Sequence, residues 1–109
     1  MGDCIFCKIA KKEIPKVFTY EDADVMVFSD IHPIRQVHLL IIPKQHVSDF
    51  LAIEDPLLFQ KLFTIVQKMV KENGLENKGY RVTINGGGAQ VVHHLHIHLM
   101  GPLTKTAAL

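Results

Sequence analysis

The chain has 109 residues, of which 48% are hydrophobic, and this is enough for one compact domain with a hydrophobic core. Twelve basic residues against eleven acidic ones leave a formal net charge of +1 at pH 7. No run of Lys or Arg is dense enough to follow a phosphate backbone, which argues against nucleic-acid binding. We therefore treat residues 1–109 as a single domain with no polynucleotide partner.

The first residues carry charges within every apolar run, so they do not read as an export signal. No apolar stretch approaches the roughly 20 residues that would span a bilayer. Only two cysteines are present, Cys4 and Cys7, whereas a secreted chain of this size usually carries a larger disulfide framework. These observations predict a cytoplasmic protein with no membrane contact.

The N-terminal half predicts one helix and three strands. Residues 4–12 can form a short helix that ends at the following Ile-Pro pair, because proline disfavours the α conformation in the residue before it. Residues 17–20 and 25–28 are short β-prone runs on either side of an acidic turn, which indicates a hairpin. Residues 38–42 are nearly continuously apolar and end at Pro43, as a buried central strand would.

The C-terminal half predicts the longest helix. Asp55 can cap it, Pro56 suits its first position, and it ends at the Asn-Gly pair of residues 73–74. Its apolar stripe reads as ordinary core and consists of Phe59, Leu62, Phe63, Val66, Met69 and Val70. Residues 80–84 and 93–100 are the last two strands. The sum is an α+β fold: an antiparallel sheet of about five strands with one long and one short helix.

Histidine is the residue type that stands out. Seven histidines occur in 109 residues, and four of them fall within residues 93–98. In a strand, side chains alternate between faces at about 3.3 Å per residue, so His94, His96 and His98 share one face while the apolar residues between them point into the core. Lys, Thr or Glu would serve a merely solvated face. Three imidazoles in register therefore indicate proton transfer, nucleophilic attack or metal binding.

A glycine run at residues 86–88 comes shortly before these histidines. Such a run lets the backbone approach a ligand and turn its N–H groups toward an anion, although a flexible hairpin loop is the alternative. Together the two features predict a phosphate placed over the histidine row.

Residues 94–100 (HLHIHLM) match the histidine triad motif, in which His alternates with apolar residues and two further apolar residues follow. The match extends over nearly the whole chain, through residues 4–9 (CIFCKI), 13–15 (EIP), 30–33 (DIHP), 38–46 (HLLIIPKQH), 79–80 (GY) and 90–93 (QVVH). On these segments the chain resembles the histidine triad family, and within it the branch of small nucleotide-binding phosphoramidases.

The resemblance implies a homodimer whose two sheets join, with a purine nucleotide in a cleft on each subunit. His96, the middle triad histidine, would attack the α-phosphate and form a nucleotidyl-histidine, which releases a nucleoside 5′-monophosphate such as AMP from an amine. Its attacking nitrogen must be unprotonated, so the other ring nitrogen would donate to a backbone carbonyl. His94 would support that arrangement, and His98 would hydrogen-bond the phosphate or the bridging atom. This catalysis needs no cofactor.

The resemblance also assigns the nucleotide contacts. Asp30 matches the acidic residue that binds the ribose hydroxyls in the family, and a carboxylate can accept hydrogen bonds from both hydroxyls. Asn85 matches the phosphate-side amide of the family, Gln90 adds a polar contact, and His38 lies near the catalytic row, where a plain core histidine is the alternative. The apolar slot for the base, for which core packing is the alternative, is assigned to Ile5, Phe6, Ile9, Ile14, Phe28 and Ile31.

A metal site is a further expectation. Cys4 and Cys7 lie three residues apart and share a face of the predicted helix. His46 and His94 occupy positions that some members of the family use, with such a cysteine pair, to hold zinc. Two cysteines and two histidines make a sound tetrahedral Zn²⁺ site, and one with four protein ligands is structural. The alternative is two buried free thiols.

Three other functions stay open at this point. One is hydrolysis of dinucleoside polyphosphates, since the loop from Asn85 to Gln90 looks shorter than in well-known members and Val91 stands where some place a serine, and both bear on the leaving group. Another is a zinc metallohydrolase in which the three alternating histidines hold a catalytic ion. The last is a nucleotide sensor whose turnover is incidental.

Overall fold

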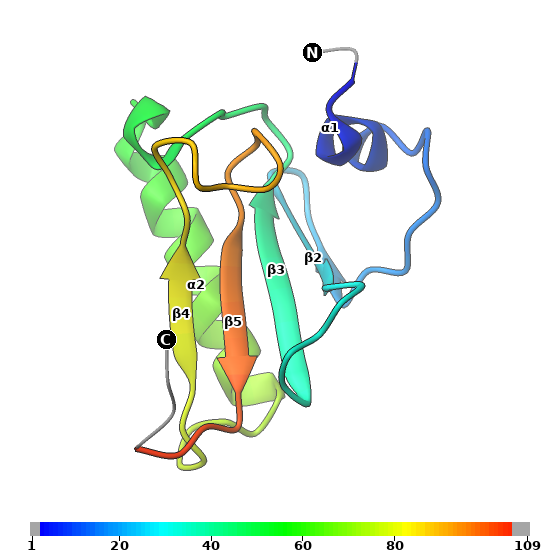
Figure 1. Cartoon of the computed structure of the whole chain (residues 1–109). Coiled ribbons are helices and arrows are strands. Elements are labelled where there is room, and N and C mark those ends of the chain that lie inside the picture. The colour runs from blue at the N-terminus through cyan, green and yellow to red at the C-terminus, as the bar shows by residue number, and fades with distance from the viewer. Residues whose placement is uncertain (1–2, 106–109) are drawn as a thin grey trace.

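The computed structural model describes residues 3–105, which form a five-stranded antiparallel sheet and two α-helices (Figure 1). In chain order the elements are α1 (Ile5–Ala10), β1 (Tyr20–Glu21), β2 (Val25–Ser29), β3 (Val37–Pro43), the 3₁₀-helix η1 (Phe50–Ala52), α2 (Pro56–Glu72), β4 (Arg81–Ile84) and β5 (Ile97–Gly101). The strand order is β1-β2-β3-β5-β4. The predicted α+β fold, with one long and one short helix, is confirmed. Among the described residues, no helix is long and apolar enough to cross a membrane.

Helix α2 begins where the sequence predicts. The Asp55 carboxylate accepts from the Leu57 N–H at 2.9 Å and caps the first turn, and Pro56 occupies the first helical position, where its missing N–H costs nothing. Ile65 belongs to its buried face, whereas Phe63, predicted to be core, is 40% exposed. Phe63 follows Leu62 by about 100° around the helix axis, which turns its ring toward the open side near β4.

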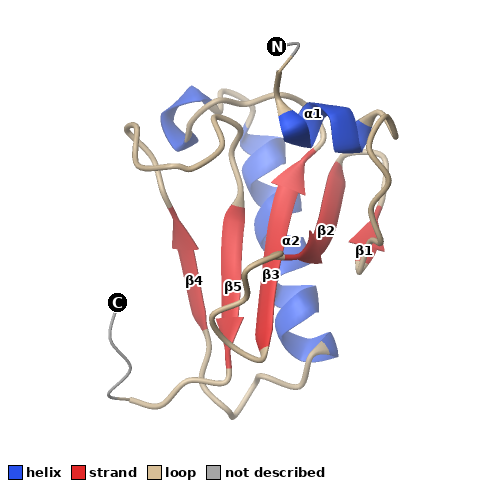
Figure 2. Ribbon diagram, turned by 45° about the vertical axis from the view of Figure 1, so that its right-hand side comes forward, coloured by secondary structure: helices blue, strands red, loops and turns tan. Residues whose placement is uncertain are grey.

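The two faces of the sheet are covered by different helices. In Figure 2, α2 runs behind the sheet while α1 crosses one end of the front. The face under α2 holds the larger core, which includes Leu95, Ile97 and Leu99, as the alternation of residues 94–99 predicts. The face under α1 holds a smaller cluster of Phe6, Ile9, Met26, Phe28, Leu40 and Ile42. The central strands are therefore buried on both sides, which explains their continuous apolar sequence.

Two predicted strands differ from the structure. Of residues 17–20, only Tyr20 is in a strand, and Val17 is 90% exposed, although Phe18 packs against the smaller core cluster. The last strand begins at Ile97 and not at residue 93. The backbone before it bonds outside the sheet ladder, since the Leu95 N–H donates to the Val47 carbonyl at 2.6 Å.

The acidic turn predicted between the first two strands is confirmed. The Asp22 carboxylate accepts from the backbone N–H groups of Asp24 and Val25, both at 2.8 Å, and from the Tyr20 hydroxyl at 2.7 Å. These bonds close the hairpin of β1 and β2.

Candidate functional site

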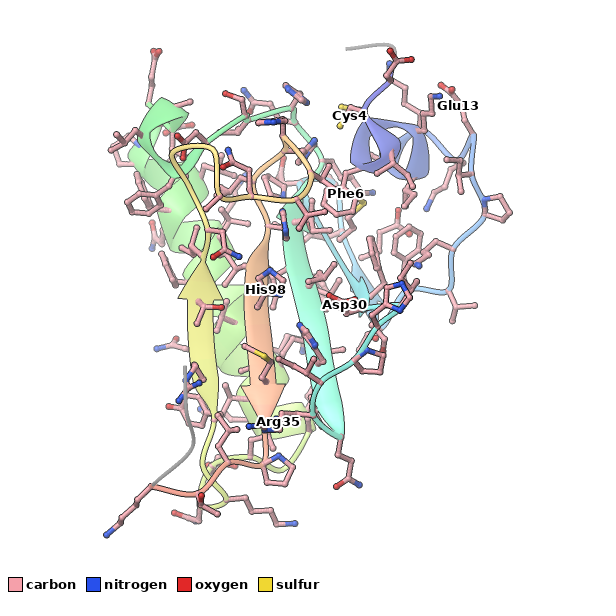
Figure 3. All side chains as sticks on the ribbon, viewed as in Figure 1. Cys4, Phe6, Glu13, Asp30, Arg35 and His98 are labelled. Atoms are coloured by element: carbon pink, nitrogen blue, oxygen red, sulfur yellow. The ribbon has the colours of Figure 1, made fainter. Side chains whose placement is uncertain are left out.

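A cavity of about 380 Å³ lies between α1 and the front of the sheet, within the size range of small-molecule sites. In Figure 3, Phe6 lies below Cys4, and Asp30 and His98 lie lower again, on either side of β3. The cavity is lined by Ile5, Phe6, Ile9, Lys16, Phe28, Asp30, Ile31, His32, Leu40, Val91, Val92, His96 and His98. Aromatic and aliphatic walls with a few converging polar groups fit a ligand with one flat apolar part and one polar part.

The His96 imidazole is 6% exposed and is held in one orientation. Its Nδ1 lies 2.8 Å from the His94 carbonyl oxygen, so Nδ1 carries the proton and donates it. Nε2 therefore keeps its lone pair in the neutral ring. The Phe6 ring meets His96 edge to face with 5.3 Å between centroids, which fixes the imidazole further. The ring is thus prepared to act through Nε2 as a nucleophile or a base.

A hydrogen-bonded chain fixes the tautomer of His98. The Ile34 N–H donates to Nδ1 of His38 at 3.2 Å, so the proton of neutral His38 is on Nε2. That Nε2–H lies 3.0 Å from Nδ1 of His98, which accepts it, and 3.5 Å from an Asp30 carboxylate oxygen. The remaining nitrogen of His98, Nε2, must then carry a proton. His98 offers a hydrogen-bond donor beside the His96 ring, whose centroid lies 5.0 Å away.

Burial is the main cause that lowers the pKa of His98 from 6.5 to about 4, and the neighbouring His96 and His38 rings add to it, against an opposing effect of Asp30. The folded protein binds this proton less readily than the unfolded chain. The stability that His98 contributes is therefore complete above pH 6.5 and is lost as the pH falls toward 4.

We expect the free energy of unfolding in urea to fall between pH 7 and pH 4.5, and to fall less steeply in His98→Gln. The exposed His93 supplies the control, because His93→Gln should keep the wild-type slope. Equal slopes in wild type and His98→Gln would contradict the assignment.

Four side chains gather beside the cavity as a Cys/His cluster, defined here as Cys4, Cys7, His46 and His94. Nδ1 of His94 lies 3.3 Å from Sγ of Cys4 and 3.6 Å from Sγ of Cys7, and Nδ1 of His46 lies 3.2 Å from Sγ of Cys7. A tetrahedral zinc ion with bonds of about 2.1–2.3 Å separates its ligand atoms by roughly 3.4–3.8 Å. Three of the separations between the predicted ligand atoms are therefore close to those in a zinc site, and all four atoms lie within 4.8 Å of one another.

The protonation chemistry of the cluster also suits a metal. The fully buried His94 places Nε2 2.7 Å from the Pro43 carbonyl oxygen, which fixes the proton there and leaves Nδ1 as the donor atom for a cation. Burial lowers the pKa of His94 and favours the neutral ring that binds metals. Burial, with the nearby Cys4, raises the pKa of Cys7, so its thiolate needs a cation to stabilise it.

The triad histidines thus divide between two sites. The His94 side chain faces the Cys/His cluster, and its backbone carbonyl accepts a hydrogen bond from His96. Among residues 3–105, the groups that could bring three or more ligand atoms together are this cluster and a set of Asp30, His38 and His98. Neither group contains all three triad imidazoles. The geometry therefore gives no support to the alternative of a metallohydrolase, in which they share one catalytic ion.

The glycine run does not have the predicted arrangement. The Gly87 N–H donates to the Asp49 carboxylate at 3.2 Å, and the Gly88 N–H donates to Oε1 of Gln90 at 2.9 Å. The Gln90 amide also donates to the Ser48 carbonyl at 3.0 Å. The Gly87 and Gly88 amides therefore already have hydrogen-bond partners within the protein, and residues 86–87 line a different cavity from the histidines. The expected phosphate cradle over the histidine row is not formed by these amides.

Most of the residues predicted to bind a nucleotide meet in the cavity. These are Ile5, Phe6, Ile9, Phe28, Asp30 and Ile31, together with His96 and His98. His38 touches the site through Asp30 and His98, whereas Ile14, Asn85 and Gln90 are not among the lining residues. Sequence reasoning did not assign Lys16, His32, Leu40 or Val92 to the site. Lys16 lies in an irregular segment, where no periodicity shows which way a side chain points.

Comparison with known proteins shows the family of the chain. A model of the HIT domain family matches residues 11–104, and the chain therefore belongs to the HIT domain family, as the histidine triad motif predicts.

Individual relatives lie close in sequence and structure. The chain is 48% identical over 105 residues to the 14 kDa zinc-binding protein of Zea mays, covering 89% of this chain and 80% of the relative. It is 43% identical over 106 residues to adenosine 5′-monophosphoramidase HNT1 of Candida albicans, covering 91% of this chain and 70% of the relative. The solved HIT family hydrolase from Legionella pneumophila Philadelphia 1 superposes with a TM-score of 0.89 at 39% identity, covering 95% of this chain and 96% of that one.

Proposed function

We propose that the chain is a hydrolase that splits a purine nucleoside 5′-monophosphate from an amine, with His96 as the nucleophile. The observation that carries the proposal is the His96 ring, which is buried in the wall of the cavity with Nδ1 bonded to the His94 carbonyl. The names of two relatives, an adenosine 5′-monophosphoramidase and a HIT family hydrolase, support this chemistry.

In the first step, the Nε2 lone pair of His96 forms a bond to the α-phosphorus, and the P–N bond breaks with its electron pair on the leaving nitrogen. That nitrogen takes a proton from solvent and departs as an amine. The substituted imidazole is positively charged, and its Nδ1–H bond to the His94 carbonyl becomes a stronger, charge-assisted one. The Nε2–H of His98 donates to a phosphate oxygen or to the bridging atom.

In the second step, water attacks the same phosphorus, the bond from phosphorus to Nε2 breaks, and His96 returns to its neutral form. The attacking water loses a proton to solvent, which balances the proton taken up in the first step. Two displacements at phosphorus each invert it, so the overall reaction retains configuration.

The test is a panel of substrates for the purified protein: adenosine and guanosine 5′-monophosphoramidates beside dinucleoside polyphosphates, with products separated by chromatography. We expect the phosphoramidates to be cleaved faster. Cleavage of dinucleoside polyphosphates alone would show that the leaving group is assigned wrongly. Nucleotide binding with no cleavage would show that the protein is a nucleotide sensor and not an enzyme.

Asp30 is proposed to hold the ribose. Its carboxylate lines the cavity and is 21% exposed, with one oxygen accepting from the His32 N–H at 2.8 Å. We expect Asp30→Ala to weaken nucleotide binding by about 1.5–3 kcal/mol, the scale of hydrogen bonds to a charged group.

Calorimetry with a nucleotide and its 2′,3′-dideoxy analogue tests the Asp30 assignment as a double-mutant cycle. Asp30→Asn serves as the matched variant, since its amide oxygen can still accept from the His32 N–H. Equal affinity of wild type for the two ligands would show that Asp30 does not bind the ribose hydroxyls.

The Cys/His cluster is proposed to hold structural zinc. Its donor set, spacing and tautomers fit Zn²⁺, and the zinc-binding relative from Zea mays supports this. Cys4, Cys7, His46 and His94 would be the ligands. When bound, the ion would tie the N-terminal helix to the segment before β5, and the catalytic steps above do not pass through it.

The homodimer is also proposed. β4 is one of the two edge strands of the sheet, and beside it a hollow of about 500 Å³ is lined in part by Phe63, Tyr80 and Val82. Phe63 is 40% and Tyr80 48% exposed, so a second copy that adds its own β4 would cover both rings. We expect sedimentation equilibrium to give a dimer for wild type and a monomer for Phe63→Glu. Leu51→Glu, at a residue 86% exposed and outside this hollow, should stay dimeric. A monomeric wild type would contradict the proposal.

A further inference from the structure

Lys16 is the one lysine among the residues that line the cavity. Its Nζ lies 4.7 Å from the centroid of the Phe28 ring, over the face of that ring. The Phe6 ring contacts both of the other rings, since its centroid lies 5.3 Å from that of His96 and 5.9 Å from that of Phe28. Lys16, which contacts Phe28, is therefore linked to His96 through the Phe28 and Phe6 rings.

A nucleoside 5′-monophosphate has its base at the end farthest from its phosphate. With the phosphorus at His96 and the ribose at Asp30, the base lies between the apolar walls and its polar edge lies toward Lys16. An ammonium donates three hydrogen bonds and accepts none. Guanine presents two acceptors, O6 and N7, whereas adenine has a donor amino group in place of O6.

We infer that Lys16 selects the base and favours a 6-oxopurine nucleotide over an adenine nucleotide, an inference that rests on the proposed function. The ion pairs within residues 3–105 use other lysines, and the ammonium of Lys16 is held by the Phe28 ring instead of a carboxylate. The cation–π contact keeps the ammonium at the cavity wall without satisfying its hydrogen-bonding capacity. A hydrogen-bond acceptor on the base would bind one of these unsatisfied N–H donors.

Lys12 supplies a matched control. Its Nζ lies 4.2 Å from the centroid of Phe18, so it makes the same kind of ring contact, but it also pairs with Glu21 and does not line the cavity. Lys16→Met keeps the aliphatic stem and removes the charge, and Lys16→Arg keeps the charge. Lys12→Met removes a charge of the same kind outside the site.

The experiment measures kcat/KM of wild type and these three variants on guanosine, inosine and adenosine 5′-monophosphoramidates. We expect wild type to prefer guanosine over adenosine by about fivefold or more, the lower end of what a base-edge contact discriminates. Inosine should follow guanosine, since it shares O6 and lacks the 2-amino group. Lys16→Met should bring the ratio close to one through KM with kcat nearly unchanged, whereas Lys16→Arg and Lys12→Met should keep the preference.

A guanosine preference that survives in Lys16→Met, or a wild-type preference for adenosine, would overturn the inference and leave the proposed function standing. If wild type cleaves none of the three substrates, the proposed function is wrong. In that case, calorimetric binding of GMP and AMP to the same proteins tests base selection by Lys16 independently of catalysis. Tighter binding of GMP in wild type but not in Lys16→Met supports the inference, and equal binding in wild type refutes it.

Discussion

His96→Ala should abolish covalent labelling and lower turnover by several orders of magnitude, because it removes the only protein atom that bonds to phosphorus in the proposed mechanism. A substrate labelled at the α-phosphate should leave acid-labile, base-stable label on wild type, and peptide mapping should place it on His96. Nucleotide binding should change little, since the proposed ribose and base contacts come from other residues that line the cavity.

Two controls sharpen the His96 result. His96→Asn keeps a polar side chain of similar reach and should be as inactive as His96→Ala, which separates nucleophilic attack from plain hydrogen bonding. His93→Ala alters an exposed histidine of the same segment that does not line the cavity, and it should stay active. Inversion at phosphorus, or full activity in His96→Ala, would refute the mechanism while leaving the family assignment intact.

Cys4→Ser should lower bound zinc from about one equivalent per chain to a small fraction, since one of four ligands becomes a hydroxyl. Zinc binding is coupled to folding, so we expect a loss of at least about 3 kcal/mol, or roughly 10–20 °C in Tm for a domain of this size. Metal analysis and thermal unfolding measure the two effects on the same samples.

Wild type stripped of metal by a chelator should unfold at the temperature of Cys4→Ser, and zinc should restore wild type but not the variant. His32→Ala is the matched control, because this exposed histidine lies outside the Cys/His cluster and should keep the metal. A wild-type protein that is purified without metal and has full stability would refute the zinc proposal.

The parts of the fold that could be predicted from sequence are those that local chemistry determines. Asp55 and Pro56 start α2 by capping and by fixed backbone geometry, both of which are visible in the sequence. The apolar run of β3 and the alternation after His94 report burial on one or both faces directly. The Nδ1 bond of His96 to a backbone carbonyl is predicted from the role that the family resemblance implies for this residue.

What could not be predicted depends on contacts between distant segments. β5 begins late because Leu95 bonds to Val47 and His94 turns its ring to the Cys/His cluster, and neither partner is near in sequence. Asp49 and Gln90 take the amides of the glycine loop, although the same glycines could equally face an anion. Lys16 reaches the cavity only because an irregular segment folds back over Phe28.

The closed hydrogen bonding of the glycine loop has a consequence for competition in solution. Free inorganic phosphate has no ribose or base, and the amides of Gly87 and Gly88 are already committed to Asp49 and Gln90. With a formal net charge of only +1, the chain also does little to concentrate small anions at its surface. Under the proposed function, the nucleoside part would add its contacts to the single His98 hydrogen bond, so we expect free phosphate to compete only weakly with a nucleotide for the cavity.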